Sequence, residues 1–433
     1  MKVVLLAAGR SFRMAPIVDK NFLKFLGKPL IEHQIGALKK AGFREILVVG
    51  GKHNLKDLKK LGCPVREQKN LDLGMSGAVL TAASWIKNDP FLLVSANDVV
   101  DESAYALLGK HAKKNEGLML AAKVSKYFPG GYLKISPRGL ITKIVEKPKP
   151  GREPSKLVNI VMHYHPQPKA LFEALKKISS DKDDRYEQAL QVLFDSGVAY
   201  RALPFSGFWQ PLKYPWHALD LMNYYLRNLA KNFPHAAEVA KSAKITGNVF
   251  LDDGVKVFDN AVIIGPAYIG KNTVIATNAL VRQSHIGANC VIGFGSEVAR
   301  SYVGDGVWTH TNYIGDSIIG DDVSFGAGTV TGNFRLDEKE IAVSISKKWN
   351  GKVTEEKIET GLTKLGLITG SHIRVGINTS FMPGVKIGSN SFVGAGITLG
   401  EDVPKGSFAR GDWKLKISLN NEKISPRVKG KNS

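Results

Sequence analysis

Residues 245–281 read ITGNVFLDDGVKVFDNAVIIGPAYIGKNTVIATNALV, and an aliphatic residue returns in this stretch at every sixth position. The residue four positions after each of the first six is small or branched. This period predicts a prism-shaped β-helix, in which each six-residue unit makes one flat side and three units make one coil. The aliphatic residue of each unit points into the axis, and because no coil can bury its own apolar side, the coils must stack. The aliphatic positions are Ile245, Leu251, Val257, Ile263, Ile269, Ile275 and Val281, and the smaller residues are Val249, Val255, Ala261, Ala267, Thr273 and Ala279.

The same period returns further along the chain. After some steps of five residues, a second strict six-residue run extends from Thr369 to Leu399. Residues 337–366 break the rhythm, which predicts an inserted loop or hairpin. From Pro404 onward eight Lys and Arg residues outnumber two acidic ones, and we expect this basic tail on the outside of the prism or on a neighbouring subunit. The members of the second run are Thr369, Val375, Phe381, Ile387, Val393 and Leu399.

The first half of the chain has a different pattern, in which strand and helix signals alternate. Apolar runs at residues 2–8, 45–49 and 91–94 predict strands. Residues 29–41 predict a helix, with a proline near its first position, apolar residues on one side and a glycine after its end. This rhythm predicts a mostly parallel sheet with helices on both faces.

The composition is that of an ordinary globular protein, with 43% hydrophobic and 23% charged residues. The apolar start of the chain is too short for a membrane span and has no basic region before it, so we expect no signal peptide and no membrane contact. The two cysteines, Cys63 and Cys290, lie far apart without metal-ligand spacing. This cysteine usage fits a reduced compartment, so we expect a cytoplasmic location.

The net charge of +21 has three explanations. One is a nucleic-acid partner, but the lysines are scattered and no basic helix with interleaved aromatic residues stands out, which argues against it. Another is anionic substrates such as sugar phosphates, nucleoside triphosphates and coenzyme A, which benefit from a positive field. The third is a lysine-rich surface of the kind found in thermophiles.

A group of polar residues follows the predicted strands at the carboxyl edge of the sheet. Residues 5–14 read LLAAGRSFRM, a glycine-rich turn in which backbone N–H groups can approach a triphosphate and Arg13 can neutralise it. Lys20 lies seven residues before Gly27, and Asp98 ends a strand where a carboxylate can hold Mg²⁺. Taken singly, such a turn is more often structural and Asp98 could simply cap a helix. The order and spacing of these residues together are specific.

These segments resemble the sugar-1-phosphate nucleotidyltransferase family over roughly the first 220 residues. The resemblance implies in-line attack of a sugar-1-phosphate oxygen on the α-phosphorus of a nucleoside triphosphate, with release of pyrophosphate and with Arg13 and Lys20 as catalytic cations. It also implies Asp98 as the protein ligand of Mg²⁺. The residues implied to bind the nucleotide are Ala7, Ala8, Gly9, Arg13, Lys20, Asp72 and Gly74, and those implied to bind the sugar phosphate are Gly131, Glu146, Lys147 and Asn159.

Three positions depart from the pattern of that family. Ser11 stands where the family has a glycine, and Asp72 stands where it has a base-reading glutamine. Pro211 stands where the family has a second metal-binding carboxylate or an asparagine, and proline has no side-chain donor atom for a metal. The resemblance favours UTP as the nucleotide, but AAGRSFRM and GMSGAV are also similar to cytidylyltransferases of the molybdenum-cofactor type, which leaves the base open.

Residues 310–333, HTNYIGDSIIGDDVSFGAGTVTGN, give the strongest signal in the sequence. A histidine alone would indicate only a solvated position on the prism. The whole stretch closely resembles the acetyltransferase half of bifunctional amino-sugar-1-phosphate acetyltransferase/uridylyltransferases, particularly archaeal forms. The likeness continues through FRLDEKE and TKLGLITGSHIRVGINTSFMPGVKIG and covers most of residues 235–410.

This second resemblance implies a general base and its partners. His310 would remove a proton from the substrate ammonium before the amine attacks a thioester carbonyl, since imidazole titrates near neutrality. Tyr313 and Asn333 are implied to bind the sugar or the developing oxyanion. Lys339 is implied to bind the phosphate, although it could equally be a solvated charge in the inserted loop.

The resemblance also implies that backbone around Ala327 and Ala395 lines a groove for acetyl-CoA. That groove would lie between the subunits of a homotrimer or a multiple of it, because one prism alone offers no deep cleft. The departures from the family in this half are Ala299 and Ala342 in place of basic residues, with Arg300 adjacent to the first, and Ser324 in place of an asparagine.

Together these patterns predict an α/β protein with a Rossmann-like nucleotidyltransferase domain over residues 1–232 and a left-handed parallel β-helix of hexapeptide repeats over 233–410, followed by a basic tail over 411–433. The expected activities are acetyl-CoA-dependent N-acetylation of an amino-sugar 1-phosphate and NTP-dependent nucleotidyl transfer to a sugar 1-phosphate. One alternative is an acetyltransferase whose first domain only senses nucleotide or sugar. Another is a non-enzymatic scaffold, against which the stretch around His310 argues.

Overall fold

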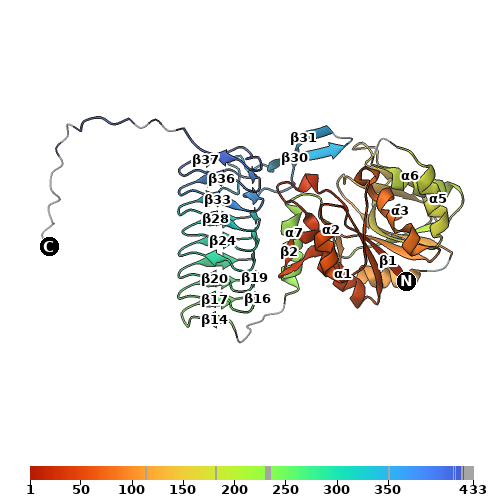
Figure 1. Cartoon of the computed structure of the whole chain (residues 1–433), viewed down its shortest axis with the longest axis horizontal. Coiled ribbons are helices and arrows are strands. Elements are labelled where there is room, and N and C mark those ends of the chain that lie inside the picture. Colours follow the sequence, from red (N-terminus) through yellow and green to blue (C-terminus); the bar gives the residue numbers. More distant parts are fainter. Residues whose placement is uncertain are drawn as a thin grey trace.

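The computed structural model has two parts that lie side by side, an α/β part from the first half of the chain and a long stack of short strands from the second half (Figure 1). A hairpin from the stack reaches over to the α/β part (Figure 1). The predicted domain boundary at 232/233 and much of the predicted tail over 411–433 fall outside the described residues. The structure describes the whole chain except residues 113, 114, 181, 182, 230–235, 350, 351, 413, 415, 421, 422 and 424–433.

A nine-stranded sheet forms the centre of the α/β part, with the order β10-β9-β11-β6-β1-β4-β5 and with β8 joining β11 to β12. β1 (Lys2–Leu6) pairs in parallel with β4 (Glu45–Gly50) and β6 (Phe91–Ser95), as the apolar runs predict. In the other half β11 (Leu157–His165) pairs antiparallel with β6, β8 and β9, so the prediction of a mostly parallel sheet is wrong there. The other strands of this part are β2 (Lys24–Phe25), β3 (Lys28–Pro29), β5 (Val65–Glu67), β7 (Asp98–Val100), β8 (Gly117–Lys123), β9 (Gly131–Ile135), β10 (Ile141–Glu146), β12 (Tyr200–Pro204) and β13 (Trp209–Pro211).

Helices cover both faces of this sheet, as the alternating pattern predicts. Val3 and Leu5 of β1 pack in one apolar layer with α1 and α4, whereas Val4 packs in the opposite layer with α3, α5 and α6. None of the helices in the described part of the chain is long and apolar enough to cross a membrane. The helices are α1 (Leu30–Lys40), α2 (Leu55–Leu58), α3 (Gly74–Ile86), α4 (Glu102–His111), α5 (Pro168–Lys177), α6 (Arg185–Asp195) and α7 (His217–Arg227), and the 3₁₀ turns are η1 (Phe12–Met14), η2 (Lys20–Phe22), η3 (Lys59–Leu61) and η4 (Leu71–Leu73).

The second part is a stack of coils with three faces, and every strand pair within a face is parallel. The aliphatic residues of the six-residue period lie in one continuous buried core along its axis, with Ile245 and Leu399 partly buried at the two ends. The prediction of stacked coils with inward-pointing aliphatic residues is therefore confirmed.

The three faces are named here by their strands. The first face contains β15 (Lys244–Thr246), β18 (Val262–Ile264), β21 (Leu280–Arg282), β24 (Glu297–Ala299), β26 (Tyr313–Gly315), β29 (Val330–Thr331), β34 (Ser380–Phe381) and β37 (Thr398–Leu399). The second face contains β16 (Val249–Leu251), β19 (Ala267–Ile269), β22 (His285–Ile286), β25 (Tyr302–Val303), β27 (Ile318–Ile319), β32 (Ile368–Thr369) and β35 (Lys386–Ile387). The third face consists of two four-stranded sheets that isolated bridges of Trp308 to Val291 and Ser324 join. Its strands are β14 (Glu238–Val239), β17 (Lys256–Val257), β20 (Val274–Ile275), β23 (Val291–Ile292), β28 (Val323–Phe325), β33 (Ile373–Val375), β36 (Phe392–Val393) and β38 (Phe408–Ala409).

The residues that break the repeat include an antiparallel hairpin of β30 (Ala342–Trp349) and β31 (Lys352–Glu359). This hairpin docks on the α/β part, where Val343 and Ile345 are buried in one apolar cluster with Met14 and Leu212. The second face of the stack also contacts the α/β part, because the His285 ring accepts a hydrogen bond from the Leu26 backbone N–H at 3.1 Å. The two parts therefore share a buried core.

Candidate functional site

A pocket of about 310 Å³ opens at the carboxyl end of β1, where the chain leaves the sheet at Leu6. It gathers most of the residues that the sequence assigns to nucleotidyl transfer. Ala7 lies beneath it and is buried, and its carbonyl accepts hydrogen bonds from the side-chain amides of Asn21 and Asn54. The predicted residues that line the pocket are Ala8, Gly9, Arg13, Lys20, Asp72, Gly74, Asp98, Gly131, Glu146 and Asn159.

The glycine-rich turn follows Gly9 and bends at Ser11, whose φ of 53° lies in the left-handed region. This conformation explains why the resembling family has a glycine there, since only glycine adopts it without steric cost. The turn leads into η1, which carries Arg13 on the wall of the pocket.

Three basic side chains line the pocket near the Asp98 carboxylate but without a close ion pair. Among the described residues, Arg13, Lys20 and Lys213 make no ion pair within 4.0 Å. Desolvation by burial, with the Arg13 charge adding to it, lowers the pKa of Lys20 to about 8. Burial also lowers the pKa of Lys213 to about 7, against the opposing effect of Asp98. Such cations are suited to bind the oxygens of a phosphate chain.

Lys213 is a pocket residue that the sequence interpretation missed. It lies two positions after Pro211, in the segment already inspected for a second metal ligand. A basic residue only two positions from the expected second metal ligand was the signal in the sequence that could have identified Lys213.

Asp98 is buried at the start of β7, and desolvation raises its pKa. β13 pairs antiparallel with β7, and the register sets Pro211 opposite Asp98. In the described part of the chain, no group of three or more His, Cys, Asp or Glu residues could hold a metal ion. The chain therefore offers Asp98 without the second carboxylate of the family pattern.

The far wall of the pocket suits a polyhydroxy ligand. Gly131 lies opposite Glu146 in the register of β9 and β10, and a Cβ added at Gly131 would lie 3.0 Å from Asn159 Nδ2. Asn159 Nδ2 is buried and has no hydrogen-bond partner among the described residues. A buried donor without a partner is costly, so a ligand oxygen at this place would satisfy it. Lys147 Nζ lies 2.9 Å from Glu146 Oε1, so Lys147 forms an ion pair with a residue of this wall.

The rim of the pocket also carries Asp72 and Gly74, two residues that the sequence predicts to bind the nucleotide. Asp72 Oδ1 lies 2.5 Å from Arg10 Nη2, so this carboxylate is paired and partly solvated. Gly74 opens the 13-residue helix α3 with a φ of +54°, and a Cβ at this position would lie 2.6 Å from an Asp183 oxygen. Backbone N–H groups at such a helix start favour anions.

In the stack, the edge between the third and first faces collects three residues expected in acetyl transfer. Successive turns along this edge are joined by backbone hydrogen bonds, from Gly328 N to Thr311 O and from Asn378 N to Ala327 O. These turns carry His310, then Ala327, and a further turn carries Ala395, all exposed. In the described part of the chain the His310 imidazole makes no hydrogen bond, and so it is free to meet a ligand.

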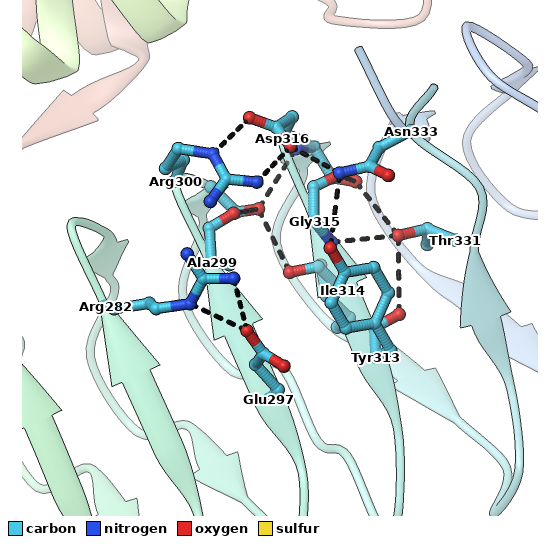
Figure 2. A network of polar contacts seen from close by, with 12 residues as sticks. Arg282, Glu297, Ala299, Arg300, Tyr313, Ile314, Gly315, Asp316, Thr331 and Asn333 are labelled. Carbon is cyan, nitrogen blue, oxygen red and sulfur yellow. Dashed lines mark hydrogen bonds and ion pairs between the residues drawn. The ribbon is translucent and has the colours of Figure 1, made fainter. Parts of the chain in front are cut away.

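The opposite edge of the first face carries a polar network, shown in Figure 2. The Asn333 side-chain amide donates to Tyr313 Oη at 3.2 Å and to Asp316 Oδ2 at 2.5 Å. The Arg300 guanidinium donates two hydrogen bonds to Asp316, at 2.7 and 2.6 Å. Figure 2 also shows Arg282 turned toward Glu297 on the preceding strands.

The two edges are close together. β26, which begins at Tyr313, spans only three residues between them, or about 10 Å. The structure therefore brings Tyr313 and Asn333 into contact and sets His310 across one narrow face from them. Asp316 was missed by the sequence interpretation, although it lies within the quoted stretch. Lys339 is not part of the network, because its Nζ is exposed 4.0 Å from Asp337 in the loop after Asn333.

Known protein families match both parts of the chain. Residues 3–231 match the family described as MobA-like NTP transferase domain, and residues 233–350 match the GMPPB C-terminal domain. A protein of Sulfurisphaera tokodaii, described as bifunctional sugar-1-phosphate nucleotidylyltransferase/acetyltransferase, is 32% identical over 94% of this chain and 99% of its own. The bifunctional protein GlmU of Methanococcus vannielii is 30% identical over 97% of this chain and 100% of its own.

Proposed function

Because the chain belongs to the family of bifunctional sugar-1-phosphate nucleotidylyltransferase/acetyltransferases, we propose that it catalyses both reactions. One is N-acetylation of an amino-sugar 1-phosphate, such as glucosamine 1-phosphate, by acetyl-CoA. The other is transfer of a nucleotidyl group from an NTP to a sugar 1-phosphate, which gives an NDP-sugar and pyrophosphate. The observation that carries the assignment of the first domain is the pocket itself, where Arg13 and Lys20 line the same space as a buried Asn159 donor that has no hydrogen-bond partner in the described structure.

In nucleotidyl transfer the residues of the pocket bind and orient the two substrates. Arg13 and Lys20 hold the phosphates of the NTP, and Asn159 and Glu146 bind hydroxyls of the sugar. An oxygen of the sugar 1-phosphate forms a bond to the α-phosphorus, and the bond from that phosphorus to the bridging oxygen of pyrophosphate breaks. The fixed cations stabilise the charge that develops on the leaving pyrophosphate. UTP is the proposed nucleotide.

The Mg²⁺ implied by the family does not fit the residues present as a two-ligand protein site. Asp98 is the one carboxylate at that place in the described structure, Pro211 lies opposite it, and cations of Arg13, Lys20 and Lys213 lie around it. Any Mg²⁺ that arrives bound to the triphosphate is part of the substrate. Binding of the NTP phosphates is therefore assigned to the basic side chains of the protein.

In acetyl transfer the ammonium of the sugar first loses one proton to solvent. The amine nitrogen then attacks the thioester carbonyl while His310 accepts its second proton. The carbon–sulfur bond breaks, and His310 returns that proton to the leaving thiolate of CoA. Tyr313 and Asn333 bind the sugar or the oxyanion, and Lys339 binds the phosphate. Backbone at Ala327 and Ala395 lines the groove for acetyl-CoA.

The acetyl site also supports a homotrimer of left-handed β-helices, with the groove between subunits. Beside the His310 edge lies an exposed apolar strip, which a second copy of the chain would cover. More than half of each of these side chains is exposed: Phe294, Trp308, Ile377, Phe392 and Phe408. We propose a cytoplasmic location for this assembly. Light scattering should give a trimer or a multiple of it, and an active monomer would contradict this arrangement.

One experiment tests both proposed activities. The protein is incubated with glucosamine 1-phosphate, acetyl-CoA and each NTP in turn, and the products are identified by mass spectrometry. The proposal expects the N-acetylated sugar phosphate and an NDP-sugar. Acetylation without any NDP-sugar would favour the second candidate, an acetyltransferase with a sensing domain, for which Pro211 opposite Asp98 is the supporting observation.

A further inference from the structure

Lys213 is fixed beside Asp98 by the segment that follows β13. The Leu212 backbone N–H donates to the carbonyl of Asn97 at 2.8 Å, and the Leu212 side chain is fully buried. This anchoring ties the segment to the turn that carries Asp98. Lys213 Nζ donates to the Pro129 carbonyl at 2.7 Å and lies 3.9 Å from the centre of the Phe128 ring. The ammonium is therefore held in one position on the pocket wall.

The Lys213 ammonium keeps capacity for a ligand. An ammonium has three donors, and within the described part of the chain only the hydrogen bond to Pro129 uses one of them. Its charge is not cancelled by an ion pair within 4.0 Å in the described structure, and Phe128 shields one side of it from water. Because burial lowers the pKa of Lys213 to about 7, the side chain is only partly charged near neutral pH, and a bound anion favours its ammonium form. In that form a partly desolvated ammonium attracts phosphate oxygens more strongly than one in bulk water.

The position of Lys213 relates it to the missing metal ligand. Pro211 occupies the place of that ligand opposite Asp98, and Lys213 follows it on the same pocket wall. A metal ion held between two protein ligands would bring positive charge to this place. In this chain the Lys213 side chain brings positive charge to the neighbourhood of Asp98 instead.

We propose that Lys213 is a phosphate-binding residue of this pocket, whose ammonium supplies beside Asp98 the positive charge that a protein-held metal ion would otherwise supply. This inference rests on the proposed nucleotidyl transfer and names a further residue for it. Its consequence is that the pocket binds a polyphosphate without a divalent cation.

The test is calorimetric titration of the full-length protein with inorganic pyrophosphate, in EDTA and in excess Mg²⁺. Wild-type protein should bind pyrophosphate in EDTA. Lys213→Met, which keeps an unbranched apolar side chain of similar length, should bind roughly 10- to 100-fold more weakly in EDTA, the worth of a charge-assisted hydrogen bond. Lys213→Arg should retain binding, and Lys134→Met, at an exposed lysine of β9, should match wild type.

The outcomes separate this inference from the proposed function. Pyrophosphate binding that requires Mg²⁺ in the wild type, or that is unchanged by Lys213→Met in EDTA, overturns the role of Lys213 and leaves nucleotidyl transfer standing. Absence of binding by pyrophosphate and by every NTP, with or without Mg²⁺, overturns both. If Lys213 only supports the loop at Pro129, Lys213→Met lowers the melting temperature but leaves the ratio of the pyrophosphate dissociation constants in EDTA and in Mg²⁺ unchanged. This outcome also overturns the inference. Lys213→Gln provides a second neutral variant should the methionine variant fold poorly.

Discussion

Pro211 lies directly opposite Asp98 in the antiparallel pair of β13 and β7. Residues opposite each other in such a pair carry their side chains on the same face, with Cβ atoms about 4.5–5.5 Å apart. A carboxylate in place of Pro211 would therefore share a metal ion with Asp98. In this chain the position instead carries a proline ring without donor atoms.

This pairing predicts the effect of Pro211→Asp. The added carboxylate should create a two-ligand Mg²⁺ site, so Mg²⁺ should strengthen pyrophosphate binding by about tenfold more in the variant than in wild type, or roughly 1.4 kcal/mol. Calorimetry at several Mg²⁺ concentrations measures this. Pro211→Ala is the matched control, because it also releases the backbone restraint of proline but adds no ligand. Equal Mg²⁺ dependence in the two variants would show that position 211 does not face the Asp98 carboxylate.

His310→Ala tests the base of acetyl transfer. The side chain is exposed and makes no hydrogen bond in the described structure, so its removal should leave the fold intact. The rate of acetylation should fall by roughly 10²–10⁴-fold, the usual contribution of a general base. Consumption of acetyl-CoA is followed, with His372→Ala as control, since His372 pairs with Asp322 elsewhere on the stack. Turnover within a few-fold of wild type would remove His310 from the mechanism.

Asp316→Ala tests the network that holds Asn333. Loss of this carboxylate leaves Arg300 and Asn333 without their shared partner, at a cost of about 1–3 kcal/mol. The kcat/KM of acetylation should fall by roughly 5- to 150-fold, whereas nucleotidyl transfer should be unchanged. Asp259→Ala, on a distant coil where the Asp259 side chain bonds only Ser242 among the described residues, serves as control. An equal loss of both activities would point to a general loss of stability.

Ile345→Ala tests the docking of the hairpin. Ile345 is buried in the cluster that joins β30 to Met14 and Leu212, and truncation of a buried isoleucine costs about 2–5 kcal/mol. Unfolding of the α/β part, followed by calorimetry, should shift to lower temperature. Val353→Ala on the paired strand should change stability by less than about 0.5 kcal/mol, because Val353 is 61% exposed. Equal shifts in the two variants would mean that the hairpin contact adds no stability.

The sequence predicts those parts of this structure that depend on local periods. The six-residue repeat predicts the inward-facing residues of the stack because each coil repeats one burial pattern. The apolar runs likewise predict β1, β4 and β6, which are buried on both faces. The antiparallel half of the sheet was not predicted, because strands such as β9 and β10 are half exposed and their patterns are mixed.

Contacts between distant segments account for the residues that sequence reasoning missed. Lys213 enters the pocket only because β13 pairs with β7, which brings together segments more than a hundred residues apart. Asp316 joins Arg300 and Asn333 through neighbouring coils, and no spacing within one coil indicates that contact. Docking of the hairpin on η1 depends on how the two parts are placed relative to each other. Neither the strand–helix alternation nor the six-residue repeat contains that information.

The most direct test of the bifunctional assignment is pyrophosphate release by the full-length protein across a panel of NTPs and sugar 1-phosphates, measured on preparations that also acetylate glucosamine 1-phosphate. The account predicts robust release with at least one pair, UTP foremost, and its loss in Lys20→Ala while acetylation continues. Binding of nucleotide and sugar phosphate without any pyrophosphate, across the full panel of bases, sugars and divalent metals, would contradict it.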